Sequence, residues 1–96
     1  MDRRKLLIAD DSEMNRAMLA NMLDHDFQII EAVDGYETIS ALEMYKGEIA
    51  ALLLDIVMPV MDGFEVLNTM NRNHRIEDIP VIMISSEDAD TVVRRA

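Results

Sequence analysis

Cysteine is absent from this chain, which excludes a disulfide framework and thiolate chemistry. The absence also fits a reducing compartment, and we expect a cytoplasmic location. No stretch approaches the roughly 20 apolar residues that a membrane span needs. The basic start of the chain is followed by a short apolar run, 6–9, before two acids, which is too short for a signal-peptide core.

Basic residues are also scarce: nine Lys and Arg stand against 19 Asp and Glu, giving a net charge of −10. The pI is near 4.4. Because nucleic-acid binding requires clustered Lys and Arg to neutralise phosphates, we expect no direct nucleic-acid partner. With 96 residues, 50% of them hydrophobic, the chain predicts one small domain over 1–96.

Short apolar runs alternate with segments of helical spacing along the whole chain. We expect strands at 5–9, 27–32, 49–54 and 80–84, helices at 12–24, 35–46 and 63–72, and a further helix that opens at Glu87 or Asp88. The repeated strand–helix unit predicts an α/β fold: a doubly wound parallel sheet with right-handed crossovers and helices on both faces.

Apolar residues at helical spacing indicate which helix faces are buried. Those at 39, 42 and 45 mark a face of the second helix, and those at 66, 67 and 70 mark a face of the third. In the first helix Met14, Ala17, Met18 and Met22 recur at this spacing. We expect the nine methionines to be flexible core filler on helix faces.

Acidic side chains stand where two of the predicted strands end. Asp55 follows a run of five apolar residues, 50–54, and Asp10 and Asp11 follow the strand at 5–9. Because the carboxyl ends of parallel strands meet at one edge of a sheet, we expect the three carboxylates to lie together. A single acid at a strand end is more often a helix cap or a solvated loop residue. Three acids at one edge of the sheet instead favour chemistry with a cation or a phosphoryl group.

Two hydroxyl groups, Ser85 and Ser86, follow the strand at 80–84 and should reach the same edge, although a Ser before a helix is usually a cap. His25 and His74 lie in polar surroundings near helix ends. We interpret both histidines as solvated surface residues.

The sequence, with these acids and hydroxyl groups after its predicted strands, resembles the receiver domain of two-component response regulators over roughly 6–96. The motifs are an acidic pair after the first strand, a Ser or Thr after the fourth, and the pattern D-x-x-M-P-x-x-D-G, matched by Asp55, Met58, Pro59, Asp62 and Gly63. The stretch EAVDGYETISAL, 31–42, is also similar to the family's second strand and helix.

The resemblance implies a flavodoxin-like (βα)5 fold with strand order 2-1-3-4-5, here truncated within the fourth helix. It also implies that Asp55 accepts a phosphoryl group from a sensor histidine kinase or phosphotransfer protein. The family's Mg²⁺ would bind Asp11 and Asp55 directly, Asp10 through water, and the backbone carbonyl of Val57. By the same resemblance we expect a regulatory phosphoacceptor and not an enzyme.

The resemblance further implies that Ser85 hydrogen-bonds the transferred phosphoryl group and that Ser86, being small, leaves access to it. The family's fifth unit, with its lysine and aromatic switch residue, is expected to be missing, and neither Lys5 nor Lys46 is placed to substitute. Either the sequence is a fragment of a longer chain, in which we expect an output domain, or it is an incomplete receiver that signals poorly. Without a fifth unit, the strand at 80–84 would be an exposed edge, open to dimerisation or strand exchange.

Two other functions make different demands on the same residues. A phosphohydrolase of the haloacid dehalogenase type needs a second Asp two residues after its nucleophile, where this chain has Val57. A receiver-like interaction module that works without phosphorylation would fit the missing fifth unit, but the intact acidic site argues against it.

Overall fold

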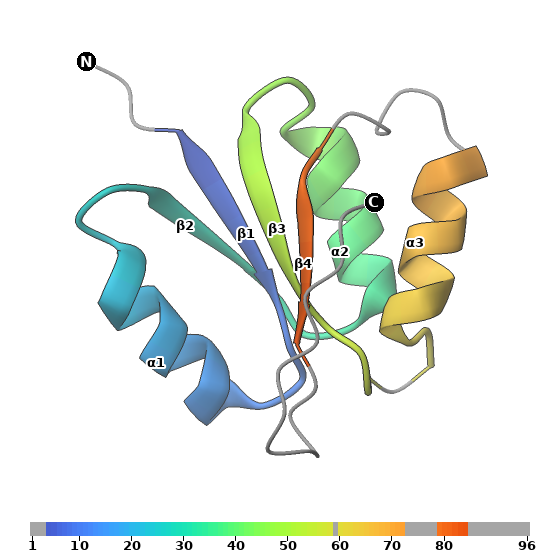
Figure 1. The fold of residues 1–96 in the computed structure, drawn as a ribbon, viewed down its shortest axis with the longest axis horizontal. Coiled ribbons are helices and arrows are strands. Elements are labelled where there is room, and N and C mark those ends of the chain that lie inside the picture. The colour runs from blue at the N-terminus through green and yellow to red at the C-terminus, as the bar shows by residue number, and fades with distance from the viewer. Residues whose placement is uncertain (1–3, 59, 73–78, 85–96) are drawn as a thin grey trace.

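The computed structural model describes residues 4–58, 60–72 and 79–84, in which four strands alternate with three helices (Figure 1). The elements are β1 (Lys5–Ala9), α1 (Glu13–Leu23), β2 (Gln28–Ala32), α2 (Gly35–Met44), β3 (Ile49–Asp55), α3 (Gly63–Arg72) and β4 (Val81–Ile84). Each begins and ends within two residues of its predicted position. The helix expected at Glu87 or Asp88 lies outside the described residues.

The four strands form one parallel sheet in the order β2-β1-β3-β4, as the alternating pattern predicts. Ala9, the last residue of β1, pairs with Ala32 of β2 and Leu54 of β3. Asp55 pairs with Ile84, so it closes β3 as the last strand residue instead of following the strand. The two central strands, β1 and β3, therefore end side by side.

One face of the sheet is covered by α2 and α3 (Figure 1). Leu7, Leu52 and Leu54 of the sheet are fully buried there against Leu42 of α2 and Val66 of α3. The inward faces predicted for both helices are confirmed, with the residues at 39, 45 and 67 packed against this cluster. This larger core holds the strands rigidly behind the carboxyl edge.

The opposite face carries a smaller cluster, formed by Leu6, Ile8 and Leu53 of the sheet. In the described part of the chain, α1 is the helix on this face (Figure 1). It contributes Leu19, Ala20 and Leu23, which are partly buried.

The prediction that the methionines fill the core is wrong for four of them. Met14, Met18 and Met22 of α1 are 80%, 55% and 68% exposed, and Met44 of α2 is 71% exposed. The reason is that α1 has two apolar stripes at helical spacing, and the leucine stripe is the one that meets the sheet. The buried methionines, 58, 70 and 83, belong to the larger core.

Each helix begins at a side-chain cap. The Ser12 hydroxyl accepts a hydrogen bond from Asn15 N (3.2 Å). Asp34 Oδ1 accepts from the backbone N of residue 37 (2.8 Å). Asp62 and Glu65 cap each other reciprocally: Asp62 Oδ1 accepts from Glu65 N (3.0 Å), and Glu65 Oε1 accepts from Asp62 N (3.3 Å). These caps set where the loops at the carboxyl edge stop.

The amino edge of the sheet carries a separate ion pair. Lys5 Nζ lies 2.6 Å from Glu48 Oε1, and 5.5 Å from the ring centroid of Tyr45. His25 is exposed, as expected, and His74 lies outside the described residues. Within the described segments, none of the helices has the length and apolar character needed to cross a membrane.

Candidate functional site

Asp10 and Asp11 occupy the turn between β1 and α1. Asp10 is 4% exposed, and its backbone N donates to Ala32 O (3.0 Å), which extends the strand pairing by one residue. Its carboxylate accepts hydrogen bonds from Ser12 N at Oδ1 (2.8 Å) and from Asn15 Nδ2 at Oδ2 (3.4 Å). Asp11 is exposed. The turn therefore presents one fixed, buried acid and one acid open to solvent.

Asp55 stands at the end of β3 and is 2% exposed. Its Oδ1 accepts a hydrogen bond from Val57 N (3.3 Å), and the next peptide is held by Ile56 N to Ile84 O (3.0 Å). The chain that follows Asp55 is thus tied to β4 and to the Asp55 carboxylate itself, which fixes where the carboxylate projects.

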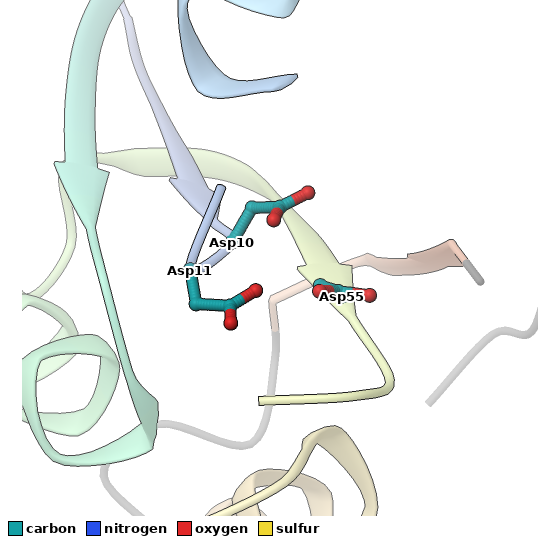
Figure 2. A group of neighbouring side chains, drawn as sticks. All are labelled: Asp10, Asp11 and Asp55. Carbon is teal, nitrogen blue, oxygen red and sulfur yellow. The ribbon is translucent and has the colours of Figure 1, made fainter. Parts of the chain in front are cut away.

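The three carboxylates meet at the carboxyl edge of the two central strands. Ligand oxygens of Asp10, Asp11 and Asp55 all lie within 4.8 Å of one another. Figure 2 shows the side chains of Asp10 and Asp11 leaving the end of β1 and that of Asp55 leaving the end of β3. Carboxylate oxygens are the hard ligands that divalent cations such as Mg²⁺ prefer, so the donor set fits such an ion. Because only Asp11 is exposed, a cation would reach the cluster past this residue.

The loop from β3 to α3 lies tightly against the start of α2. A Cβ added to Gly35, the first residue of α2, would lie 2.5 to 2.6 Å from Met61, so the loop touches the start of α2 through a residue with no side chain. Within the same loop Val60 has φ of 70°, which is strained for a β-branched residue. The loop that follows Asp55 is therefore held in a costly conformation.

The predicted site residues divide into three groups. Asp10, Asp11 and Asp55 are brought together. Val57 donates its N–H to Asp55, its side chain is 43% exposed, and the role expected for its carbonyl stays a prediction. Ser85 and Ser86 lie outside the described residues, as does Pro59 of the sequence motif.

Sequence reasoning missed the residues that hold the acidic turn. Asn15 and Arg16 of α1 and Glu31 of β2 all bond around Asp10. A signal was present, because Arg16 stands at the first position of a stripe whose later members, at 19, 20 and 23, are apolar and face the sheet. A charged residue at an inward position calls for a specific partner.

Known proteins match this arrangement over nearly the whole chain. Residues 6–96 fit the family described as the response regulator receiver domain. The two-component response regulator ORR5 of Oryza sativa subsp. japonica is 33% identical over 92 residues, which cover 94% of this chain and 67% of the rice protein.

Solved structures agree. The N-terminal domain of a response regulator receiver protein from Methanoculleus marisnigri JR1 superposes with a TM-score of 0.76 at 35% identity, covering 82% of this chain and 63% of that one. A chain in the crystal structure of the CheX–CheY–BeF3–Mg²⁺ complex from Borrelia burgdorferi gives 0.77 at 34% identity, covering 88% and 63%. This chain thus spans less than two thirds of the length of these two matched chains.

The sheet order, the three acids at the carboxyl edge and the match over 6–96 agree with one another. The fold is flavodoxin-like, and the chain belongs to the response regulator receiver domain family.

Proposed function

We propose that this domain is a phosphorylation-dependent signalling switch in which Asp55 accepts a phosphoryl group and the acidic cluster holds Mg²⁺. The observation that carries the proposal is the approach of three carboxylate oxygens to within 4.8 Å at the carboxyl edge of the sheet. Carboxylates gathered so closely repel one another, and a divalent cation relieves that repulsion.

The three acids have different surroundings, which support different roles. Both oxygens of Asp10 already accept hydrogen bonds, from Ser12 N and from the Asn15 side chain, so Asp10 suits a water-mediated position. Asp11 is exposed and available as a direct ligand, together with Asp55 and the carbonyl of Val57. When bound, Mg²⁺ would neutralise charge on the phosphoryl oxygens.

Asp55 is buried at the end of a central strand, where Ile56 N donates to Ile84 O and Val57 N donates to the Asp55 carboxylate, and this fixed placement supports its role as nucleophile. In the proposed step a carboxylate oxygen of Asp55 attacks phosphorus, and the phosphorus–nitrogen bond of a phosphohistidine breaks. An acyl phosphate forms on the domain, and the imidazole leaves with the bonding electron pair. The donor is a sensor histidine kinase or a phosphotransfer protein.

Ser85 is proposed to hydrogen-bond the transferred phosphoryl group and to couple it to downstream change, with Ser86 leaving access. An output domain in a longer chain would read that change. We propose that the domain works in the cytoplasm, which suits a chain without cysteine.

Treatment of the full chain with acetyl phosphate and Mg²⁺ tests the assignment. Intact mass should rise by one phosphoryl group, and hydroxylamine should remove it, because an acyl phosphate is attacked by strong nucleophiles. Asp55→Asn should abolish the modification, and the matched control Asp26→Asn, an exposed acid in the turn after α1, should leave it unchanged. A phosphoryl group mapped to a serine or a histidine would contradict the proposal.

Two alternative functions give other outcomes. A phosphorylation-independent interaction module would show no change in its amide spectrum with beryllofluoride and Mg²⁺. A phosphohydrolase would release inorganic phosphate with repeated turnover, which requires an acid two residues after the nucleophile. Val57 occupies that position with an apolar side chain, so we expect the acyl phosphate to accumulate.

A further inference from the structure

Arg16 joins three elements beside the acidic cluster. Its side chain, on α1, is only 12% exposed. Its Nη1 donates to the backbone carbonyl oxygen of Asp10 (2.7 Å), at the end of β1. Its Nε donates to Glu31 Oε1 (2.9 Å), on β2. The guanidinium group therefore adds a side-chain hydrogen bond to a turn that is also held by the backbone hydrogen bond from Asp10 N to Ala32 O.

The carbonyl that Arg16 binds belongs to the peptide between Asp10 and Asp11. Because a peptide unit is planar, the direction of this C=O sets the plane from which the Cα of Asp11 departs. The Asp10 carboxylate is held by its own partners, Ser12 N and Asn15 Nδ2. The exposed Asp11 carboxylate depends instead on the orientation of its backbone.

We propose that Arg16 is a positioning residue for the cation site, which directs the Asp11 carboxylate toward Asp55. Glu31 keeps the Arg16 guanidinium group away from the carboxylates. The inference rests on the proposed function, since it concerns the affinity of the same site for Mg²⁺. Residues that orient metal ligands in this way commonly change metal affinity by about 10- to 100-fold when they are replaced.

The charge of Arg16 taken alone predicts the opposite effect. A cation beside three carboxylates competes with Mg²⁺, so removing it would increase Mg²⁺ affinity. Positioning requires the affinity to fall when Arg16 is lost. The sign of the change therefore separates the two roles.

Replacing Arg16 with lysine also distinguishes a role of charge from a role of positioning. Arg16→Lys keeps the charge but replaces the planar fork, which here serves a carbonyl and a carboxylate at once, with a single ammonium group. A role of charge alone predicts unchanged affinity in Arg16→Lys, whereas positioning predicts a loss.

Glu31 has the complementary role. In Glu31→Ala the guanidinium group loses its partner on β2 and can turn toward the nearby acids, where it would compete with the metal. We expect Mg²⁺ affinity to fall. In the double variant Arg16→Gln with Glu31→Ala the loss should be smaller than the sum of the two single losses, because both act through one contact.

Mg²⁺ titration of the full chain, followed by calorimetry and by amide chemical shifts, tests the proposal. We expect Arg16→Gln and Arg16→Lys to weaken Mg²⁺ binding by about 10-fold. Lys46→Gln, which removes an exposed positive charge at the far end of α2, is the control and should bind as wild type. With acetyl phosphate, the Arg16 variants should recover a near wild-type rate at saturating Mg²⁺, which a general loss of structure would not allow.

The outcomes are distinguishable. Unchanged or tighter Mg²⁺ binding in the Arg16 variants overturns the positioning role while leaving the proposed function intact. A wild-type chain that binds no Mg²⁺ overturns the cation site itself, and the positioning role with it. If Arg16→Gln does not fold, as judged by its amide spectrum, Arg16→Lys and Glu31→Ala decide the question in the same way.

Discussion

Gly63 and Asp55 are in direct backbone contact. A Cβ added to Gly63 would lie 2.6 Å from the carbonyl oxygen of Asp55 and 2.9 Å from the Cα of Ile56, and Gly63 N donates to Ile56 O (2.9 Å). No side chain separates the first residue of α3 from the end of β3. The glycine of the motif is thus required by close approach of two backbones, and not only by the turn that precedes the helix.

Gly63→Ala should therefore destabilise the fold, because the new methyl group meets backbone atoms that cannot move aside. We expect the free energy of unfolding to fall by about 2 kcal/mol. Urea denaturation measures it, with Ser40→Ala on the exposed face of α2 as the control, expected to change stability by less than about 0.5 kcal/mol. Equal stability of Gly63→Ala and wild type would contradict the close approach.

Val60→Gly should stabilise the domain. Val60 is 76% exposed and has φ of 70°. Glycine therefore relieves strain of about 1 to 3 kcal/mol and loses little buried surface. The opposing cost, from the greater entropy of the unfolded chain, is roughly 0.5 to 1 kcal/mol. We expect a net gain of about 1 kcal/mol by urea denaturation. The same change at Val57, whose φ is not positive, should destabilise; a loss at both positions would refute the strain.

Asp11→Asn and Asp55→Asn should each stabilise the metal-free domain. Two carboxylates about 5 Å apart repel by on the order of 3 kcal/mol at an effective dielectric constant near 20, and water reduces this for the exposed Asp11. We expect a gain of about 1 to 2 kcal/mol, a rise in Tm of roughly 4 to 8 °C per kcal/mol, and loss of most of the Mg²⁺ response.

Melting curves with and without millimolar Mg²⁺ test this prediction. Asp26→Asn, remote from the cluster, should keep the wild-type Mg²⁺ shift. An equal Mg²⁺ shift in wild type and in the Asp11 and Asp55 variants would place the cation elsewhere.

The exposed methionine stripe of α1, formed by Met14, Met18 and Met22, predicts a contrast between helices. Met18→Gln should change the free energy of unfolding by less than about 0.5 kcal/mol, because the side chain is already in water. Met70→Ala on α3, where the side chain is 2% exposed, should cost about 2 to 5 kcal/mol. Chemical denaturation of both variants, with unchanged m-values, provides the comparison; similar losses would mean that α1 buries its methionines.

The sheet was predictable because the strand–helix alternation and the right-handed crossover leave few arrangements open. The acidic cluster was predictable for the same reason: Asp10 and Asp55 each end an apolar run, and parallel strands end at one edge. Output domain, cytoplasmic location and association through β4 stay predictions.

Three features could not be predicted from the spacing of residues along the chain, because tertiary packing decides them. In α1 a methionine stripe and a leucine stripe both have helical spacing, and only packing against the sheet decides between them. Arg16 donates to the backbone carbonyl of Asp10, and because every residue has such a carbonyl, the sequence does not indicate which one is bound. The positive φ of Val60 runs against the preference of its own side chain, so only the surrounding loop can impose it.

The pairing of β1 with β3 also has a kinetic consequence. Ala9 pairs with Leu54, far away in the sequence, and all of β2 and α2 intervenes. A chain that has formed only its early strand–helix–strand segment has Asp10 and Asp11 but lacks the third acid. The complete cation site therefore arises only when this non-local pairing forms, which is a slow kind of folding event. Cation binding that needs all three acids thus measures the population of folded chains.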